Sequence, residues 1–181
     1  MFGYIYKSIQ YLLEPLGLKY YNLYNDQFNN EKFEGVDYPA VLIDIKFSES
    51  LRYHKKIQMF EVDVDLYLAT RFTSDLRKGD IQQDAGLVHL DMLTELFKTL
   101  ENKSTTDLPT ELLSDRLNMG HIHRTNVEML TNYNSIKVTK NTFAFMFTDA
   151  SAYPTYTEVD VDYELVTFIN DVAQAKTIQI N

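Results

Sequence analysis

The chain has 181 residues, a formal net charge of −9, thirteen tyrosines and no cysteine or tryptophan. Its length suits one domain with a substantial core. The lack of cysteine excludes disulfides, thiolate nucleophiles and cysteine-bound zinc. The acidic balance argues against a surface that grips nucleic-acid phosphates, although not against a surface past which DNA slides. So many tyrosines are typical of β-rich folds and of surfaces partly buried against partners.

The sequence has no apolar run near the roughly 20 residues that a membrane span needs. Its N-terminus lacks the basic start and the small-residue cleavage site of a signal peptide. We therefore expect no membrane contact, and synthesis and folding in the cytoplasm.

Apolar residues recur at steps of three and four over residues 1–14, which predicts an amphipathic helix. Pro15 disfavours helical geometry in the residue before it, and Gly17 completes the stop. Residues 18–30, rich in Tyr and Asn, predict a short strand followed by a loop.

Residues 60–68 form the strand around which the remaining elements are expected to pack. Even positions are apolar and odd positions are acidic or aromatic, which is the two-residue period of a half-buried strand. A partner strand is predicted over residues 36–47, and the polar residues 48–56 should join the two as a long hairpin. The side chains expected to point outward from the first strand are Glu61, Asp63, Asp65 and Tyr67.

A charged turn is predicted over residues 70–80, followed by a second helix over residues 83–100. The apolar stripe of this helix consists of Leu93, Leu96, Phe97 and Leu100. The polar residues 101–118 lack a core pattern and predict a mobile loop with one helical turn at 111–116. A structureless stretch of this length usually has a function.

Strands are predicted over residues 121–130 and 135–148. In the second strand the apolar parity changes between Val138 and Phe143, which predicts a bulge or a turn near Lys140 and Asn141. The string Glu-Val-Asp-Val-Asp returns within residues 157–165, which should form another long strand of the same sheet.

These elements predict an α+β fold: a mainly antiparallel β-sheet with two principal helices packed on one face. We expect a single domain over residues 1–170. Residues 171–181 are expected to form a C-terminal extension that adds an edge strand.

Two acidic strand faces are the first candidate for chemistry. If their strands were neighbours, their carboxylates could converge on a divalent cation and support a metal-dependent hydrolase. However, the acidic residues repeat monotonously along two strands, as solvated faces do. We therefore expect an acidic surface and no metal site. The residues are Glu61, Asp63, Asp65, Glu158, Asp160, Asp162 and Glu164.

Two histidines, His121 and His123, would point the same way on a strand, as in some metal sites. The spacing indicates no third ligand, because His54 and His89 lie on separate elements. The sequence also lacks a nucleophile motif and a phosphate-binding glycine-rich loop. We therefore expect no catalytic, cofactor-binding or metal-binding residues, and a protein that is not an enzyme.

The order of these elements and their residue composition resemble those of the tail-terminator (tail-completion) proteins of long-tailed bacteriophages and related injection machines. The resemblance covers the chain up to about residue 168 and rests on element order, without a diagnostic motif. The residues after 170 have no counterpart in it. Its pieces are the first helix, the strand entry Tyr38-Pro39-Ala40-Val41, the hairpin partner at 60–69, the helix from Gln83, the aromatic strand 142–147 leading into Thr148-Asp149-Ala150-Ser151-Ala152, and the acidic strand at 157–165.

The resemblance implies a hexameric ring that caps the tail tube, stops its polymerisation and offers the surface that joins the filled head. The implied partners are other copies of the chain, the tail-tube protein and a head-completion or neck protein. The implied location is the neck end of the virion tail. An acidic bore would suit DNA passing without specific binding, because like charges repel. The loops at 70–80 and 101–118 would contact the ring or the tube.

Overall fold

The computed structural model describes residues 1–25, 27, 36–54, 56–71, 83–133, 136–152, 164–169 and 172–177. The elements in chain order are α1 (Phe2–Leu13), η1 (Glu14–Leu16), β1 (Tyr20–Leu23), β2 (Ala40–His54), β3 (Ile57–Arg71), α2 (Gln83–Leu100), η3 (Thr105–Asp107), η4 (Thr110–Leu112), β4 (Leu117–Met119), β5 (His123–Tyr133), β6 (Ile136–Asp149), β7 (Glu164–Ile169) and β8 (Val172–Thr177). Both predicted principal helices are confirmed. Gly17 ends η1 in a left-handed conformation (φ 59°), which glycine adopts without strain.

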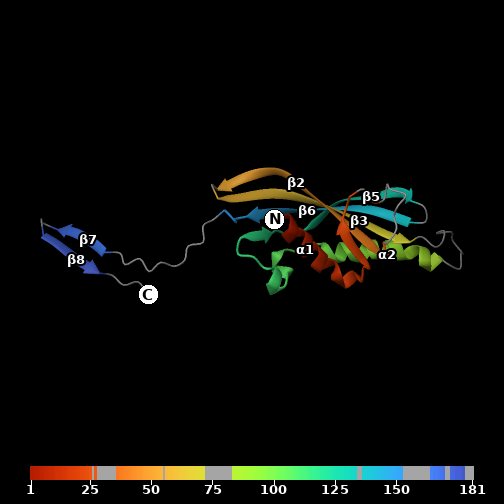
Figure 1. The fold of residues 1–181 in the computed structure, drawn as a ribbon, viewed down its shortest axis with the longest axis horizontal. Coiled ribbons are helices and arrows are strands. Elements are labelled where there is room, and N and C mark those ends of the chain that lie inside the picture. Colours follow the sequence, from red (N-terminus) through yellow and green to blue (C-terminus); the bar gives the residue numbers. More distant parts are fainter. Residues whose placement is uncertain are drawn as a thin grey trace.

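A six-stranded mixed sheet forms the centre of the molecule (Figure 1). Its path runs β1-β2-β3-β6-β4, and β5 also pairs with β6. β1 lies parallel to β2, and the other pairs are antiparallel. The long β2–β3 hairpin and the β3–β6 pair make up most of the sheet. The predicted α+β class is therefore confirmed.

Both helices cover the same face of this sheet, which we call the helix-side face (Figure 1). The sheet contributes the even positions of β3, the odd positions of β2 and the aromatic residues of β6. The helices contribute apolar residues at helical spacing, which fixes the face that each helix presents. The fully buried side chains of this core include Ile5, Ile9, Leu13, Ile43, Val64, Leu66, Leu96, Leu100, Phe143, Phe145 and Phe147.

The other face of the sheet, called here the opposite face, has a smaller apolar cluster at one end. Its buried members are Ala40, Leu42, Tyr67, Ala69 and Val138. Tyr24 stacks on Tyr67 with ring centroids 4.0 Å apart. Tyr67 therefore points away from the helix-side core, as predicted, but it is buried. Residues flanking β1 and β2 cover that part of the face.

This second cluster also explains the change of apolar parity in β6. The pairing of β3 with β6 runs without interruption from Arg71↔Ile136 to Gln58↔Asp149. The prediction of a bulge or a turn in β6 is therefore wrong, because Val138 packs in the opposite-face cluster while Phe143 packs on the helix side. The pairing of β5 with β6 has two register shifts, between Arg124 and Asn126 and between Leu130 and Tyr133.

Two predicted loops are more regular than expected. β2 continues through residues 48–54 and pairs with β3 across two register shifts, because cross-strand pairing stabilises polar strand ends. Within 101–118, the side chain of Ser104 caps η3 in a capping box with Asp107. Leu108 is buried in the main core. The loop predicted over 101–118 therefore contains two short 3-10 turns and the start of β4, and the helical turn expected at 111–116 is found slightly earlier, as η4 at Thr110–Leu112.

β7 and β8 pair with each other as a separate two-stranded sheet. The described part of the strand predicted at 157–165 therefore pairs with β8 and not with the six-stranded sheet. Residues 157–163, the end of the tail at 178–181 and residues 72–80 of the turn predicted at 70–80 lie outside the described residues. Thr70 and Arg71, assigned to that turn, instead end β3 and pair with β6. Among the helices that the structure describes, none is long and apolar enough to cross a membrane.

Candidate functional site

The predicted acidic surface maps onto the opposite face of β3, where its three members differ in environment. Glu61 is exposed, Asp63 is half-buried and Asp65 is buried. The pairing of β2 with β3 sets Lys46 directly beside Asp63. The strand periodicity therefore predicted the direction of these side chains correctly, but not their exposure.

Asp65 is held by residues from the two strands that flank β3. Its Oδ2 lies 2.6 Å from Lys46 Nζ and 3.0 Å from Lys140 Nζ. Thr142 Oγ1 donates a hydrogen bond of 2.6 Å to Oδ1. Lys46 also lies 3.3 Å from Asp44. These five residues, called here the Asp65 cluster, replace the solvated carboxylate that the sequence predicted.

Charge in this cluster is balanced locally. Burial of Asp65 works to raise its pKa, but hydrogen bonds from Lys46, Thr142 and Lys140 outweigh burial and hold the pKa below its usual value. The hydrogen bond to Asp65 raises the pKa of Lys46. An ionised carboxylate with both oxygens engaged is neither a ready proton acceptor nor a ready metal ligand. The cluster therefore binds the central strands together.

Of the remaining acidic candidates, Glu158, Asp160 and Asp162 lie outside the described residues, and Glu164 is the first residue of β7, which pairs with β8 and not with the six-stranded sheet. Among the residues that the structure does describe, no group of three or more His, Asp or Glu side chains is close enough to hold a metal ion. Within that part of the chain, the acidic surface at solvent reduces to Glu61 and Asp63.

The histidine pair is exposed. His121 and His123 flank the buried Ile122, and His121 Nδ1 lies 3.0 Å from the carbonyl oxygen of Asn102. Only His123 belongs to β5, so the shared direction predicted for two histidines on one strand stays a prediction.

His89 is the titratable residue that sequence reasoning missed. It is buried between α2 and the sheet, with Nδ1 2.8 Å from Thr70 Oγ1 and Nε2 2.6 Å from Thr139 Oγ1. Burial, reinforced by the positive charge of Lys137, lowers its pKa to about 4. A neutral imidazole offers one donor and one acceptor, which the two hydroxyls satisfy. His89 lies four residues before Leu93, so it falls on the apolar stripe of this helix. That position could have indicated from the sequence that His89 is buried.

The more distinctive surface is the outer edge of β2, which the sequence did not predict. β1 pairs with β2 only as far as Leu23↔Ile43. Beside the end of β1 lies an open cavity of about 340 Å³ between α1 and β2. Most of its lining is apolar, and Asp44 is the charged residue among the lining residues. They are Phe2, Gly3, Tyr6, Leu23, Tyr24, Asp44 and Ile45.

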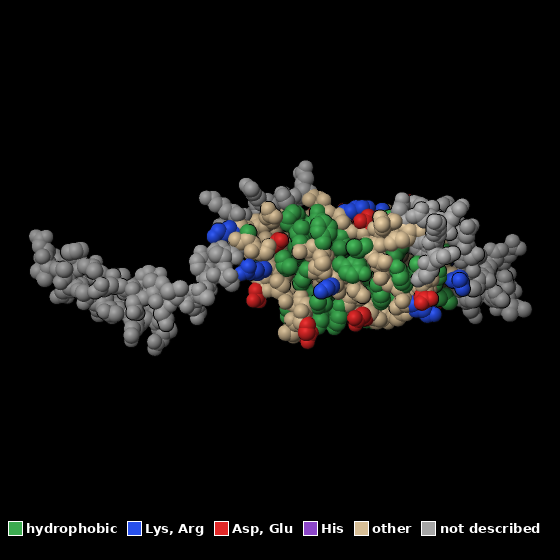
Figure 2. All heavy atoms as spheres, viewed as in Figure 1, with side chains coloured by type: hydrophobic (Ala, Val, Ile, Leu, Met, Phe, Trp, Pro, Cys, Tyr) green, Lys and Arg blue, Asp and Glu red, His purple; other side chains and the backbone are tan. Residues whose placement is uncertain are grey.

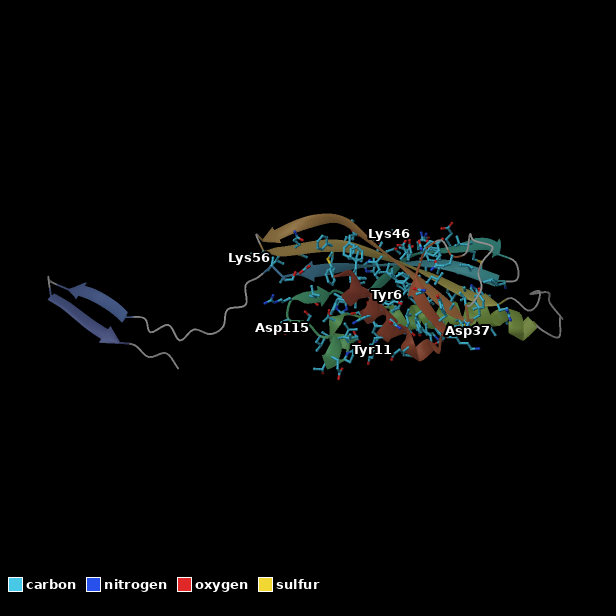
Figure 3. The ribbon with its side chains drawn as sticks, viewed as in Figure 1. Tyr6, Tyr11, Asp37, Lys46, Lys56 and Asp115 are labelled. Carbon is cyan, nitrogen blue, oxygen red and sulfur yellow. The ribbon has the colours of Figure 1, made fainter. Side chains whose placement is uncertain are left out.

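Residues of both sheet faces meet at this edge. Figure 3 labels Tyr6 on α1, on the helix side of the sheet, and Lys46, which belongs to the opposite face. Figure 2 shows hydrophobic side chains gathered over the middle of this view, with Lys, Arg, Asp and Glu scattered around them. Among the strands that the structure describes, none pairs with the edge of β2 beyond Ile43, and the cavity beside that edge is mostly apolar, a combination typical of protein-binding sites.

The chemistry that the described residues offer is therefore that of a contact surface: an unpaired strand edge, an apolar cavity and a small exposed acidic strip. No protein-family model matches the chain, and no curated protein matches it.

Proposed function

We propose that this chain is a structural protein that caps the tail tube of a long-tailed bacteriophage or of a phage-tail-like injection system. In this role it forms a ring of six copies, ends polymerisation of the tube and provides the surface to which a head-completion or neck protein joins. Its place in the virion would be the neck end of the tail, after assembly in the host cytoplasm. It would have no catalytic centre.

The observation that carries this proposal is the pair of open edges on the six-stranded sheet. A ring requires each subunit to bury two different patches in a heterologous contact that closes by rotation. Among the described residues, β2 beyond Ile43 and β5 are outer strands on opposite sides of the sheet. The α+β fold with both helices on one face also agrees with the element order on which the resemblance rests.

The acidic strip of Glu61 and Asp63 supports the proposed passage of DNA without specific binding. Both residues face away from the helices, and Glu61 is exposed. A negative lining lowers adhesion of a polyanion. Because Asp65 is neutralised by Lys46 and Lys140, it does not contribute to this lining.

The test uses the tail-tube protein encoded by the same phage or injection system. Alone, this protein should polymerise into tubes of unlimited length. Adding the chain should stop growth and place density at one end of each tube in electron micrographs. Decoration along the whole tube, or no binding, would contradict the terminator role. Binding to the head connector without any effect on tubes would instead assign the chain to another neck component.

A further inference from the structure

The two open edges of the sheet differ in sequence but are alike in length. β2 has eleven residues from Asp44 to its end at His54, and β5 (His123–Tyr133) has 11 residues. In the part of the chain that the structure describes, β5 pairs only with β6, and no strand pairs with β2 along the outer edge beyond Ile43. Unpaired backbone N–H and C=O groups of this kind are a template for another strand.

Backbone groups on β2 point into this free edge. Tyr24 N–H donates to the carbonyl oxygen of Ile43 at 2.8 Å, so the polar groups of Ile43 face outward. The backbone groups of a strand alternate in direction, so those of Ile45 and Phe47 face the same way. They lie beyond the last residue of β1, and no strand among the described residues pairs with them, so we take them as the groups that a partner strand would bind.

Exposed apolar side chains flank both edges, which is unusual for strand edges left in water. Beside β2, Phe2 is 56% exposed and Leu23 is 52% exposed, and both line the cavity. On β5, Val127 is 44% exposed and Met129 is 62% exposed.

The faces of these two apolar groups match. Val127 pairs with Asn141 and Met129 with Thr139, which are odd positions of β6 like Phe143 of the helix-side core. The cavity beside β2 opens at the sheet edge. Its helix-side wall includes Phe2 and Tyr6 of α1 and Leu23, which pairs with Ile43, whereas Tyr24 and Asp44 line it from the opposite face. Side chains of residues paired across a sheet point to the same face. A β5 strand placed beside β2 would therefore direct Val127 and Met129 into the cavity.

Strand directions match as well. β2 is antiparallel to β3, β3 to β6 and β6 to β5, so β2 and β5 run in opposite directions. Neighbours in a ring keep the same orientation about its axis. Placing β5 of one copy beside β2 of the next gives an antiparallel pair, with Glu128 on the opposite face near Lys46. These side chains carry opposite charges.

We propose that copies of this chain join head to tail by pairing β5 of one subunit with the outer edge of β2, residues 44–54, of the next. Met129 and Val127 fill the cavity between α1 and β2, and the six-stranded sheets become one continuous sheet across subunits. Closure of this contact into a ring rests on the proposed function, whereas the contact itself does not.

The chain has no cysteine, so single cysteines can report this contact. Leu23→Cys and Met129→Cys proteins carrying different tags are mixed at high concentration and treated with a short bis-maleimide. The expected product is a covalent heterodimer of the two. The control pairs Met129→Cys with Lys98→Cys, because Lys98 is exposed on α2 and belongs to neither strand of the proposed pair. Cross-linking no greater than that of the control overturns the proposed contact.

A second measurement uses charge to break the contact. Met129→Lys should abolish higher-mass species in light scattering and cross-linking at concentrations at which the unmodified chain forms them. Leu113→Lys places the same charge at a similarly exposed apolar residue (49%) after η4 and should leave assembly unchanged. Equal effects of the two variants, or none, count against the proposal. If the Leu23→Cys and Met129→Cys proteins cross-link but the chain has no effect on tail-tube growth, the contact is supported and the proposed function is contradicted.

Discussion

The two faces of the central sheet are organised by different interactions. The helix-side face buries aliphatic and aromatic side chains under α1 and α2. The opposite face has a small apolar cluster at one end, then the Asp65 cluster, then the exposed Glu61. Burial of apolar area supplies most of the free energy of folding, whereas a partly exposed ion cluster contributes less. One strand with a two-residue alternation can therefore bury side chains on both faces of a sheet, although the two faces contribute unequally to the free energy of folding.

The largest expected effect comes from the helix-side core. Phe145→Ala removes a ring that is almost fully buried and should lower the free energy of unfolding by about 3–5 kcal/mol. Met146→Ala changes the next residue of β6, which is exposed on the opposite face, and should cost less than about 0.5 kcal/mol. Urea denaturation of both variants measures the difference. If both variants lose a similar amount of unfolding free energy, the two faces contribute equally to stability and the comparison fails.

The next effect depends on pH and on His89. Burial depresses its pKa from 6.5 to about 4, so between these values the unfolded chain binds a proton that the folded chain does not. Stability is therefore complete above pH 6.5 and falls as pH decreases toward 4, by roughly 3 kcal/mol over the full window. Urea denaturation across this range should show the loss. His89→Gln should be less stable at neutral pH and should lack this slope, and an unchanged slope would contradict the assignment.

A smaller effect is expected from the opposite face. Asp65→Asn should lower the free energy of unfolding by about 1–2 kcal/mol, because Lys140 and Lys46 lose their ionic partner. Solvent limits the cost, since the side chain of Lys46 is 52% exposed. The lowered pKa of Asp65 contributes stability above its ordinary pKa that is lost as pH falls below it. Asp63→Asn is the matched control. A larger loss of stability in Asp63→Asn than in Asp65→Asn would contradict the central role given to Asp65 on this face.

The smallest effect concerns metal ions. Calcium, magnesium, manganese or zinc should leave the melting temperature almost unchanged, because a specific site would stabilise the folded chain by mass action. Differential scanning fluorimetry with each ion measures this. A metal-specific rise that Asp63→Asn abolishes would favour the hydrolase alternative over a structural role.

The sequence by itself determined the elements whose period is strong and whose signals are local. The apolar stripe of α1 and its end before Pro15 follow from residues within one or two helical turns, as does α2. The even positions of β3 also predicted the buried face of the central strand. These features depend on neighbours in the chain, so one sequence was sufficient to find them.

Only the tertiary structure decided the features that depend on contacts between distant residues. Asp65 is buried because Lys46, Lys140 and Thr142 lie on flanking strands. The alternation of β3 indicates which face Asp65 is on, but not what covers that face. The open edge of β2 arises because β1 pairs with only its first four residues, a register that no local pattern encodes. Strand neighbours and their coverage are set by the folded sheet, because side-chain periodicity fixes direction and leaves partners undetermined.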